Sequence, residues 1–278
     1  MAVLASDYQL PEKCLDLVVF SDAGNDVDDQ FALVYLFAHR QRFNLEAIYA
    51  EAYVCSGLNT RLETIEFSHR TIVELLALLG VEGEIAVLDG SARTYQNGDC
   101  DSLSAAELDF IRRARAHSPE SRLYVLAISA ATSLAGALRA APDIADSIYV
   151  LWVGGESFDW PDNRSYNAEI DYPAARCLLD APLPLVLMPG SGVLDRFLTP
   201  LIEMKSALHL DRALDQYLWK TSLECATASP FASKVLYDVL GVAYFLGRPE
   251  LKLRFELRPI MLDSGFYAFD HRRSELLY

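Results

Sequence analysis

Four aspartates are crowded into a short stretch near the amino terminus. Residues 18–29 read VVFSDAGNDVDD, and the carboxylates of Asp22, Asp26, Asp28 and Asp29 fall within eight residues of one another. Like charges at this spacing repel, so a positive charge must offset them, and a hard cation with oxygen ligands is the simplest candidate. The alternative is a solvated acidic turn that also caps a helix amino terminus, where carboxylates are favoured in any case.

The segments on either side of the aspartates predict where they lie. Residues 15–20 are mostly apolar, as is typical of a buried strand, and residues 31–37 form an apolar run typical of a buried helix. The acidic cluster therefore follows the carboxyl end of a strand, on the turn into a helix. Ligands of open α/β sheets bind at that edge of the sheet.

A second polar segment has the same setting. The chain from Gly154-Gly155-Glu156 to Asp171 follows a predicted strand and precedes a helix. The glycine pair permits a sharp turn or a close approach to a ligand. Asn163 and Asn167 offer amide donors and acceptors that suit sugar hydroxyls. An ordinary polar loop with Asx turns is the alternative interpretation.

Polar residues interrupt the apolar sequence at two further positions. Ser129–Ser133 follows the strand that ends at Ile128, and its hydroxyls favour a helix cap. Asp238 lies inside the otherwise apolar helix predicted at 233–246. A carboxylate is seldom buried without a partner, so Asp238 either points at a cation or faces solvent at a helix end.

Strand-like and helix-like segments alternate through the first two-thirds of the chain. The strands are continuous apolar runs, so helices must cover both faces of a mostly parallel central sheet. We therefore expect an α/β fold in a single domain over 1–278, with a hairpin turn at Ser264-Gly265 in the tail. The predicted strands are 15–21, 45–54, 84–88, 122–129, 147–154 and 183–188, and the predicted helices are 28–40, 60–80, 104–117, 132–141, 171–180, 209–221 and 233–246.

Composition narrows the class of partner. The 278 residues carry a formal net charge of −15, which argues against nucleic acid or an anionic membrane surface as partner. A neutral small molecule or a bound cation is compatible with it. The sequence shows no signal peptide and no apolar stretch of about 18 residues that would span a membrane. The five cysteines are scattered and form no C-x-x-C pair, which favours reduced thiols and a cytoplasmic location.

Familiar metal and nucleophile motifs are not matched. An EF-hand loop beginning at Asp22 would need glycine and glutamate where Val27 and Leu33 stand. The sequence contains no P-loop and no G-x-S-x-G elbow, and its five histidines show no metal-ligand spacing.

Taken in order, the polar segments resemble those of the inosine–uridine type nucleoside hydrolases. Ser21–Asp29 is similar to a longer form of that family's aspartate-rich signature, T-D-I-G-N-D-V-D-D, and Ser129–Ser133 weakly matches its G-P-L-T-N segment. The family's later landmarks are a glycine pair, an E-F-N segment, an aspartate and an H-D or W-D pair. They correspond here to Gly154-Gly155, Ser165-Tyr166-Asn167, Asp171 and Tyr237-Asp238.

The resemblance implies an activity and a metal. The reaction would be calcium-dependent hydrolysis of the N-glycosidic bond of a ribonucleoside, and Asp22 would bind calcium and take a proton from the attacking water. Asp29, Asp238 and the backbone carbonyl of Ile128 would be further calcium ligands. Such a site suits calcium, which takes about six to eight oxygen ligands.

The same resemblance implies how a nucleoside would be bound. Asp28, Asn167 and Asn163 would contact the ribose hydroxyls. Tyr237 stands where the family often places a group near the leaving base, so it would either donate its phenolic proton or stack on the base. Family members are commonly oligomers, so a homodimer or homotetramer is expected.

Departures from the family pattern concern the substrate rather than the metal. Ser165 replaces the glutamate of E-F-N, Tyr237 replaces histidine or tryptophan, and residues 51–55 lack an asparagine often found there. One hypothesis is a hydrolase of a modified or unusual nucleoside. A second is a catalytically silent member that binds a riboside without turning it over. A phosphate-ester hydrolase is disfavoured, because no lysine or arginine lies near the acidic cluster in the sequence.

Overall fold

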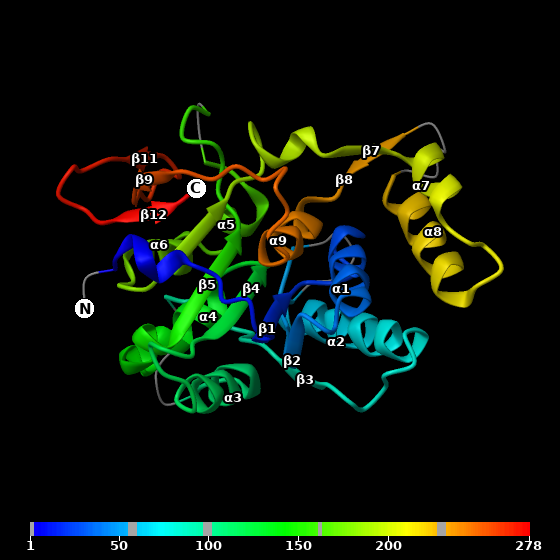
Figure 1. Ribbon diagram of the computed structural model, residues 1–278, viewed down its shortest axis with the longest axis horizontal. Helices are drawn as coiled ribbons and strands as arrows, with labels where there is room; N and C mark the ends of the chain where they lie inside the picture. The colour runs from blue at the N-terminus through cyan, green and yellow to red at the C-terminus, as the bar shows by residue number, and fades with distance from the viewer. Residues whose placement is uncertain (1–2, 55–59, 97–101, 161–162, 227–231) are drawn as a thin grey trace.

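The computed structural model describes residues 3–54, 60–96, 102–160, 163–226 and 232–278. Within these residues, an eight-stranded sheet with the order β3-β2-β1-β4-β5-β6-β12-β9 forms the centre of the molecule (Figure 1). Every neighbouring pair from β3 to β12 is parallel, and only β9 runs antiparallel to its neighbour. This confirms the predicted α/β fold. The strands are β1 Leu15–Ser21, β2 Phe43–Ala50, β3 Ala86–Asp89, β4 Leu123–Ile128, β5 Ile148–Val153, β6 Leu185–Met188, β9 Phe255–Leu257 and β12 Glu275–Leu277.

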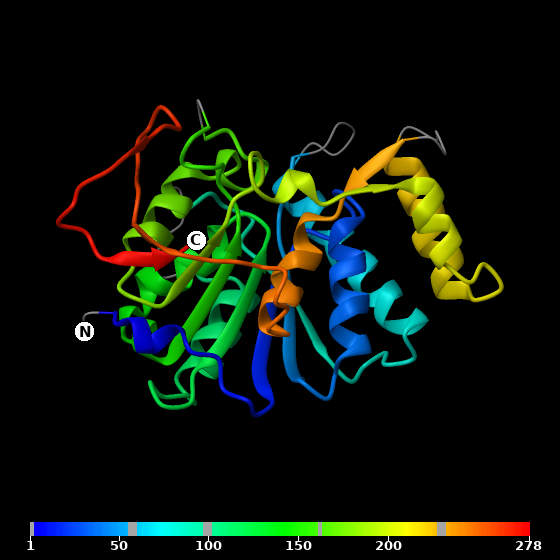
Figure 2. The same cartoon turned by 45° about the horizontal axis from the view of Figure 1, so that its top comes forward.

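Helices cover both faces of the sheet, as the continuous apolar strands require. Alternate residues of β1 enter opposite cores: Val18 and Phe20 pack with α3, α4 and α6, whereas Leu17 and Val19 pack with α1, α2 and α9. Helix α9 lies beside α1 although about 200 residues separate them in the chain (Figures 1 and 2). The helices are α1 Asp28–Ala38, α2 Arg61–Leu78, α3 Ala105–Ala114, α4 Thr132–Ala140, α6 Tyr172–Asp180 and α9 Tyr237–Phe245.

Capping residues define where two of these helices begin. Thr60 and Ser104 each accept a hydrogen bond from the backbone three residues on, and a glutamate at that position bonds back to the cap. Each pair is a capping box, which satisfies amide groups that an unfinished helix end would leave without partners. The predicted helix starts at 60 and 104 agree with these caps.

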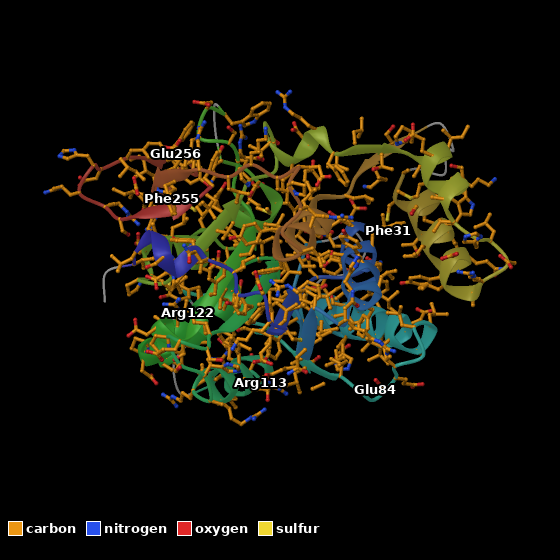
Figure 3. All side chains as sticks on the ribbon, viewed as in Figure 1. Phe31, Glu84, Arg113, Arg122, Phe255 and Glu256 are labelled. Carbon is orange, nitrogen blue, oxygen red and sulfur yellow. The ribbon has the colours of Figure 1, made fainter. Side chains whose placement is uncertain are left out.

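The segment between β6 and α9 differs most from prediction. Strands β7 Leu198–Pro200 and β8 Ser233–Val235 pair antiparallel, and α7 Leu201–Ala207 and α8 Ala213–Cys225 project from the sheet (Figure 2). The helix predicted over 233–246 is therefore wrong in its first residues, which form β8. Pairing with β7, about 35 residues earlier, decides that structure. Figure 3 shows Phe31 of α1 on the side that faces α7 and α8, where it packs against a buried cluster that includes Leu201 and Met204.

The tail contains the predicted hairpin. Strands β10 Ile260–Met261 and β11 Tyr267–Ala268 pair antiparallel, and Gly265 between them has a φ of 79°, which favours glycine. Short helices complete the fold, namely η1 Ala5–Tyr8, η2 Pro142–Ser147, η3 Leu194–Arg196 and α5 Tyr166–Glu169.

Two general predictions concern the thiols and the membrane. Cys14, Cys177 and Cys225 are free thiols, whereas Cys55 and Cys100 lie outside the described residues. In the part of the chain that the structure describes, no helix combines the length and the apolar character that crossing a membrane requires.

Candidate active site

The site lies where the chain changes direction within the sheet. From β1 the chain continues to β2 and β3 on one side, whereas β4, β5 and β6 follow on the other side. The loops after β1 and β4 therefore diverge and leave a crevice at their carboxyl ends, which is where open α/β sheets bind ligands. Ser21, the last residue of β1, is in register with Ile128, the last residue of β4.

A cavity of about 330 Å³ opens at this point. Its volume lies in the range of small-molecule sites. Its wall combines the turn after β1, the ends of β4 and β5, the turn after β6 and the start of α9. The polar residues of the wall are Asp22, Asn25, Asp26, Asp28, Asp29, Glu156, Ser165, Tyr166, Asn167, Ser191, Tyr237 and Asp238, and the wall also includes Ile128.

Three carboxylates converge in the wall of the cavity. Oxygens of Asp28, Asp29 and Asp238 all lie within 4.8 Å of one another, and the three residues are between 2% and 6% exposed. Asp28 and Asp29 occupy the first turn of α1, and Asp238 occupies the first turn of α9. Two helix amino termini therefore point their positive dipole ends at one spot, which favours negative charge there.

Asp22 lies beside these three carboxylates without belonging to the group. Asp22 is 2% exposed, and its Oδ2 accepts a hydrogen bond of 3.1 Å from the amide of Asn25. Ser21 donates a 2.6 Å hydrogen bond to Asp29 and so orients that carboxylate. Asp26, at the rim, forms an ion pair with Lys234 of β8.

Burial and mutual repulsion make this cluster difficult to ionise. Burial, followed by the charge of Asp28, raises the pKa of Asp22 to about 8. Burial, followed by the charge of Asp26, raises the pKa of Asp28 to about 7. Burial and neighbouring carboxylates also raise the pKa values of Asp29 and Asp238 well above the usual range. The cluster therefore retains protons at neutral pH unless a cation offsets its charge.

The donor set fits a hard divalent cation. Three carboxylates meet at one buried place, and Ile128, the last residue of β4, lines the same cavity. Oxygen ligands of this kind suit calcium or magnesium. Sequence reasoning assigned Asp28 to the ribose. The structure brings its carboxylate together with those of Asp29 and Asp238 at the predicted metal position, and Asp28 also lines the cavity.

The two predicted sugar-binding asparagines have different environments. Asn167 lines the cavity, and its amide donates a 2.9 Å hydrogen bond to the carbonyl of Val153, which fixes the side chain. Asn163 is 1% exposed and is not among the described residues of the cavity wall. Its Oδ1 accepts a 2.6 Å hydrogen bond from the backbone of Glu156, so Asn163 supports the loop from behind.

Ser165 stands where the family resemblance predicts a glutamate. Its side chain stabilises the local backbone. Its hydroxyl accepts hydrogen bonds of 2.7 Å from the backbone of Gly155 and 3.3 Å from that of Ala168. It thereby caps α5 and holds the glycine turn, for which Gly155 adopts a φ of 74°. The carboxylate missing at 165 is thus replaced by a short loop-binding side chain.

Tyr237, the first residue of α9, is half-buried; it lines the cavity and also packs against the apolar core between the sheet and α1. Burial, together with the negative charges of Asp195, Asp28 and Glu156, raises the pKa of its phenol. Tyr237 therefore stays protonated at neutral pH and is a weaker acid than tyrosine in water.

Residues 129–133 and Asp171 stabilise the fold around the site. The residue before α4 is Ala131, and no side chain caps this helix, so the predicted hydroxyl cap is wrong. Thr132 instead donates a 2.9 Å hydrogen bond to Asp171, which also accepts one of 2.7 Å from the backbone of Tyr95. The buried Asp171 carboxylate caps α6 through the backbone of Ala174.

Sequence reasoning missed part of the cavity wall, and it named Glu156 only as a member of the 154–171 segment, without a role. Glu156, Gly190 and Ser191 line the cavity, and the hydroxyl of Tyr166 bonds to both backbone groups of Val54. Glu156 and the 190–191 turn each follow a predicted parallel strand directly. The rule that ligands bind at the carboxyl ends of such strands would have found them.

The comparisons with known proteins agree with this arrangement. The sequence model of the inosine-uridine preferring nucleoside hydrolases matches residues 17–263, so the chain belongs to that family of glycosidases. The family is metal-dependent in general, in keeping with the buried carboxylate group. A comparison with curated protein sequences finds no match.

Solved structures show the same fold at low sequence identity. A purine-preferring ribonucleoside hydrolase from Gardnerella vaginalis is 19% identical with a TM-score of 0.74, over 94% of this chain and 92% of that one. A plant nucleoside hydrolase is 16% identical with a TM-score of 0.71, over 96% and 93%. The inosine-uridine preferring nucleoside hydrolase from Bacillus anthracis is 17% identical with a TM-score of 0.66, over 95% and 94%.

Proposed function

We propose that this protein hydrolyses the N-glycosidic bond of a ribonucleoside and depends on calcium for this activity. The observation that carries the proposal is the convergence of Asp28, Asp29 and Asp238 within 4.8 Å at the wall of a cavity. Asp22 and Asn167 line the same cavity, so a base and a sugar-binding amide face the same volume.

Calcium is the proposed ion because of the donor set. Asp28, Asp29, Asp238 and the carbonyl of Ile128 would hold it, with Asp22 at its edge. Calcium accepts many protein oxygens in flexible geometry, whereas magnesium usually keeps several waters. When bound, the ion would orient a water and the ribose diol and lower the pKa of that water.

Asp22 is the proposed general base. Its carboxylate is buried at the cavity wall, and Asn25 holds one of its oxygens. With a cation offsetting the charge of the cluster, this carboxylate would be ionised at neutral pH and could take the proton of the attacking water. Asp28 and Asn167 would contact the ribose hydroxyls. The negative wall would stabilise the positive charge that develops on the sugar as the bond breaks.

The substrate is expected to differ from the common nucleosides. Ser165 provides no carboxylate, and Tyr237, a weak acid, stands where the family often has histidine. We therefore propose poor turnover of inosine and uridine, and better turnover of modified nucleosides or ribosides with good leaving groups. A cytoplasmic homodimer or homotetramer completes the proposal. Light scattering of the purified protein would measure the assembly.

Metal binding and turnover test the proposal together. Chelator-treated protein should bind one calcium ion in a calorimetric titration and, with calcium, hydrolyse p-nitrophenyl riboside. Asp22→Asn should lower kcat by about 10²–10⁴, the usual cost of losing a general base. The control Glu169→Gln removes an exposed carboxylate from α5, outside the cavity wall, and should leave both readouts unchanged.

Two results would contradict the proposal in different ways. Absence of calcium binding in the wild type would reject the metal site. Calcium and riboside binding without turnover of any riboside would reject the enzymatic role and support a protein that only binds ribosides.

A further inference from the structure

A second group of potential metal ligands lies apart from the cavity. One ligand atom each of Asp16, Glu46 and His117 lies within 4.8 Å of the other two. Asp16 is the second residue of β1, whereas the cavity opens at the carboxyl end of this strand. The group therefore lies towards the opposite edge of the sheet. Its three residues come from distant parts of the chain, so their spacing in the sequence gives no sign of it.

A shift of strand register directs Glu46 to this group. The pairing of β1 with β2 moves by one residue next to Glu46, which is left without a partner in β1. Such a bulge re-aims the side chain of the extra residue. Oε2 of Glu46 accepts a 2.9 Å hydrogen bond from Arg113 of α3, which is labelled in Figure 3 and also pairs with Asp109. Arg113 thereby fixes the carboxylate, and Oε1 is the oxygen that faces His117.

The ring of His117, in the loop after α3, is oriented for a metal. Its Nδ1 lies 3.0 Å from the carbonyl oxygen of Ser121. A carbonyl can only accept, so Nδ1 carries the hydrogen, and the lone pair of the neutral ring is on Nε2. Nε2 lies 3.6 Å from Oε1 of Glu46, which is longer than a hydrogen bond. Two such ligands at about 2.0–2.2 Å from a tetrahedral ion lie about 3.3–3.6 Å apart, so the spacing fits a shared ion.

Asp16 completes the set of ligands and connects it to solvent. Its Oδ1 accepts a 2.7 Å hydrogen bond from the side-chain amide of Asn44 on β2. Asp16 also lines a surface cavity of about 290 Å³, which gives an ion a path of entry. Each of the three ligands is thus held by a group outside the set, namely Asn44, Arg113 or Ser121. Metal ligands are typically oriented by outer hydrogen bonds of this kind.

We propose that Asp16, Glu46 and His117 bind a divalent cation of the zinc class, with water as the fourth ligand. Imidazole and carboxylate together suit zinc, cobalt or nickel, whereas calcium and magnesium prefer oxygen ligands throughout. The bound ion would cross-link β1, β2 and the loop after α3, and so stabilise the fold. The inference goes beyond the proposed hydrolysis and does not depend on it, because its readouts need no turnover.

Two variants remove ligands while keeping the outer hydrogen bonds. In His117→Asn the side-chain amide can still donate to the carbonyl of Ser121, but Nε2 is lost. In Asp16→Asn the amide oxygen can still accept from Asn44, but the charge is lost. His39→Asn is the matched control, because Nδ1 of His39 lies 3.0 Å from a backbone carbonyl in the same way. His39 belongs to neither group of possible metal ligands among the described residues.

Calorimetric titration of the chelator-treated full chain with zinc chloride gives the first readout. Saturating calcium is present throughout, so that the cavity contributes equally in every protein. His117→Asn and Asp16→Asn should each raise the Kd of one zinc site by at least about tenfold, the lower cost of disturbing even an outer partner of a metal ligand. His39→Asn should leave this Kd unchanged.

Thermal unfolding gives the second readout. Zinc at about 100 times its Kd should raise the unfolding temperature of the wild type by about 5 °C, since the ion binds the folded state. At the same zinc concentration, a tenfold weaker site in His117→Asn should give about half of this shift. Without zinc, the wild type and His117→Asn should unfold at similar temperatures.

The outcomes decide for or against the site. Equal zinc affinity in the wild type and both ligand variants would overturn the proposal. So would zinc binding that is lost in Cys14→Ser, because the exposed thiol would then be the ligand. If the variants unfold without zinc, a crystal of the wild type grown with zinc decides. Anomalous density at about 2.0–2.2 Å from the ligand atoms of His117 and Glu46 would support the site, and its absence there would reject it. Failure of riboside turnover would count against the proposed function alone.

Discussion

Removal of one buried carboxylate should make the metal-free protein more stable. Asp22→Asn keeps the size of the side chain, and its Oδ1 can still accept the hydrogen bond from Asn25. The change eliminates a group whose pKa rises from 3.8 to about 8 on folding. Folding of the wild type at neutral pH must therefore protonate Asp22 or bury its charge.

The size of the effect follows from this pKa difference. At pH 7 the unfolded chain is about three pH units above the pKa of this carboxyl, which is therefore ionised. Keeping the proton in the folded protein then costs, as an upper value, roughly 4 kcal/mol of stability. About 1 kcal/mol shifts the unfolding temperature of a chain of this size by roughly 2–4 °C. Metal-free Asp22→Asn should therefore unfold at least about 5 °C above the metal-free wild type at pH 8.

The pH dependence has a definite sign. Below pH 3.8 the carboxyl is protonated in both the folded and the unfolded wild type, so it costs nothing. As pH rises towards 8, the unfolded chain loses a proton that the folded protein retains, and wild-type stability falls. The advantage of Asp22→Asn should therefore grow from pH 5 to pH 8. Saturating calcium should stabilise the wild type more than the variant, because the ion binds the folded state.

Differential scanning calorimetry in the presence of a chelator measures these shifts. Asp171→Asn is the matched control, because Asp171 is also buried at 4% exposure but accepts three hydrogen bonds outside the cavity. That change should lower the unfolding temperature. An Asp22→Asn protein that is no more stable than the metal-free wild type at pH 8 would refute the reasoning.

Three further predictions concern single side chains. Asp238→Asn should weaken calcium binding by at least about tenfold in calorimetric titrations, since a carboxylate ligand is lost; unchanged affinity would exclude Asp238 from the metal site. Tyr237→Phe should leave kcat for p-nitrophenyl riboside within about threefold, since this leaving group needs no general acid; a large loss on that substrate would show that the phenol acts in the hydrolytic step itself. Ser165→Ala should lower stability by about 1 kcal/mol in denaturant titrations, because the buried amide of Gly155 loses its acceptor; an unchanged midpoint would show that this hydrogen bond contributes nothing.

Local patterns in the sequence predicted most of the sheet and the first half of the site. Strands such as β4 and β5 are continuous apolar runs, and only strands buried on both faces read this way. Parallel strands place their carboxyl ends at one edge of the sheet, so local patterns placed Asp22 at a ligand-binding edge, and the family resemblance added Ile128 to the same site. The order of the polar segments then predicted the family, which the match over residues 17–263 confirms.

Contacts between distant segments were beyond the reach of sequence patterns. β8 is three residues long and exists because it pairs with β7, and β12 joins β6 from about 90 residues further along the chain. Neither strand has enough local apolar pattern to predict a partner. Such short elements depend on the surface on which they pack rather than on their own propensity.

The division of roles among the carboxylates was also decided by tertiary structure. The sequence by itself determined that Asp28 and Asp29 begin a helix after β1 and that Asp238 lies in an apolar one. Only the packing of α9 against α1 brings Asp238, more than 200 residues away, within 4.8 Å of Asp28 and Asp29. Likewise, only the fold brings Glu156 and Tyr237 into the wall of one cavity. Spacing along a chain specifies which groups share an element, whereas distances between elements depend on how the whole core packs.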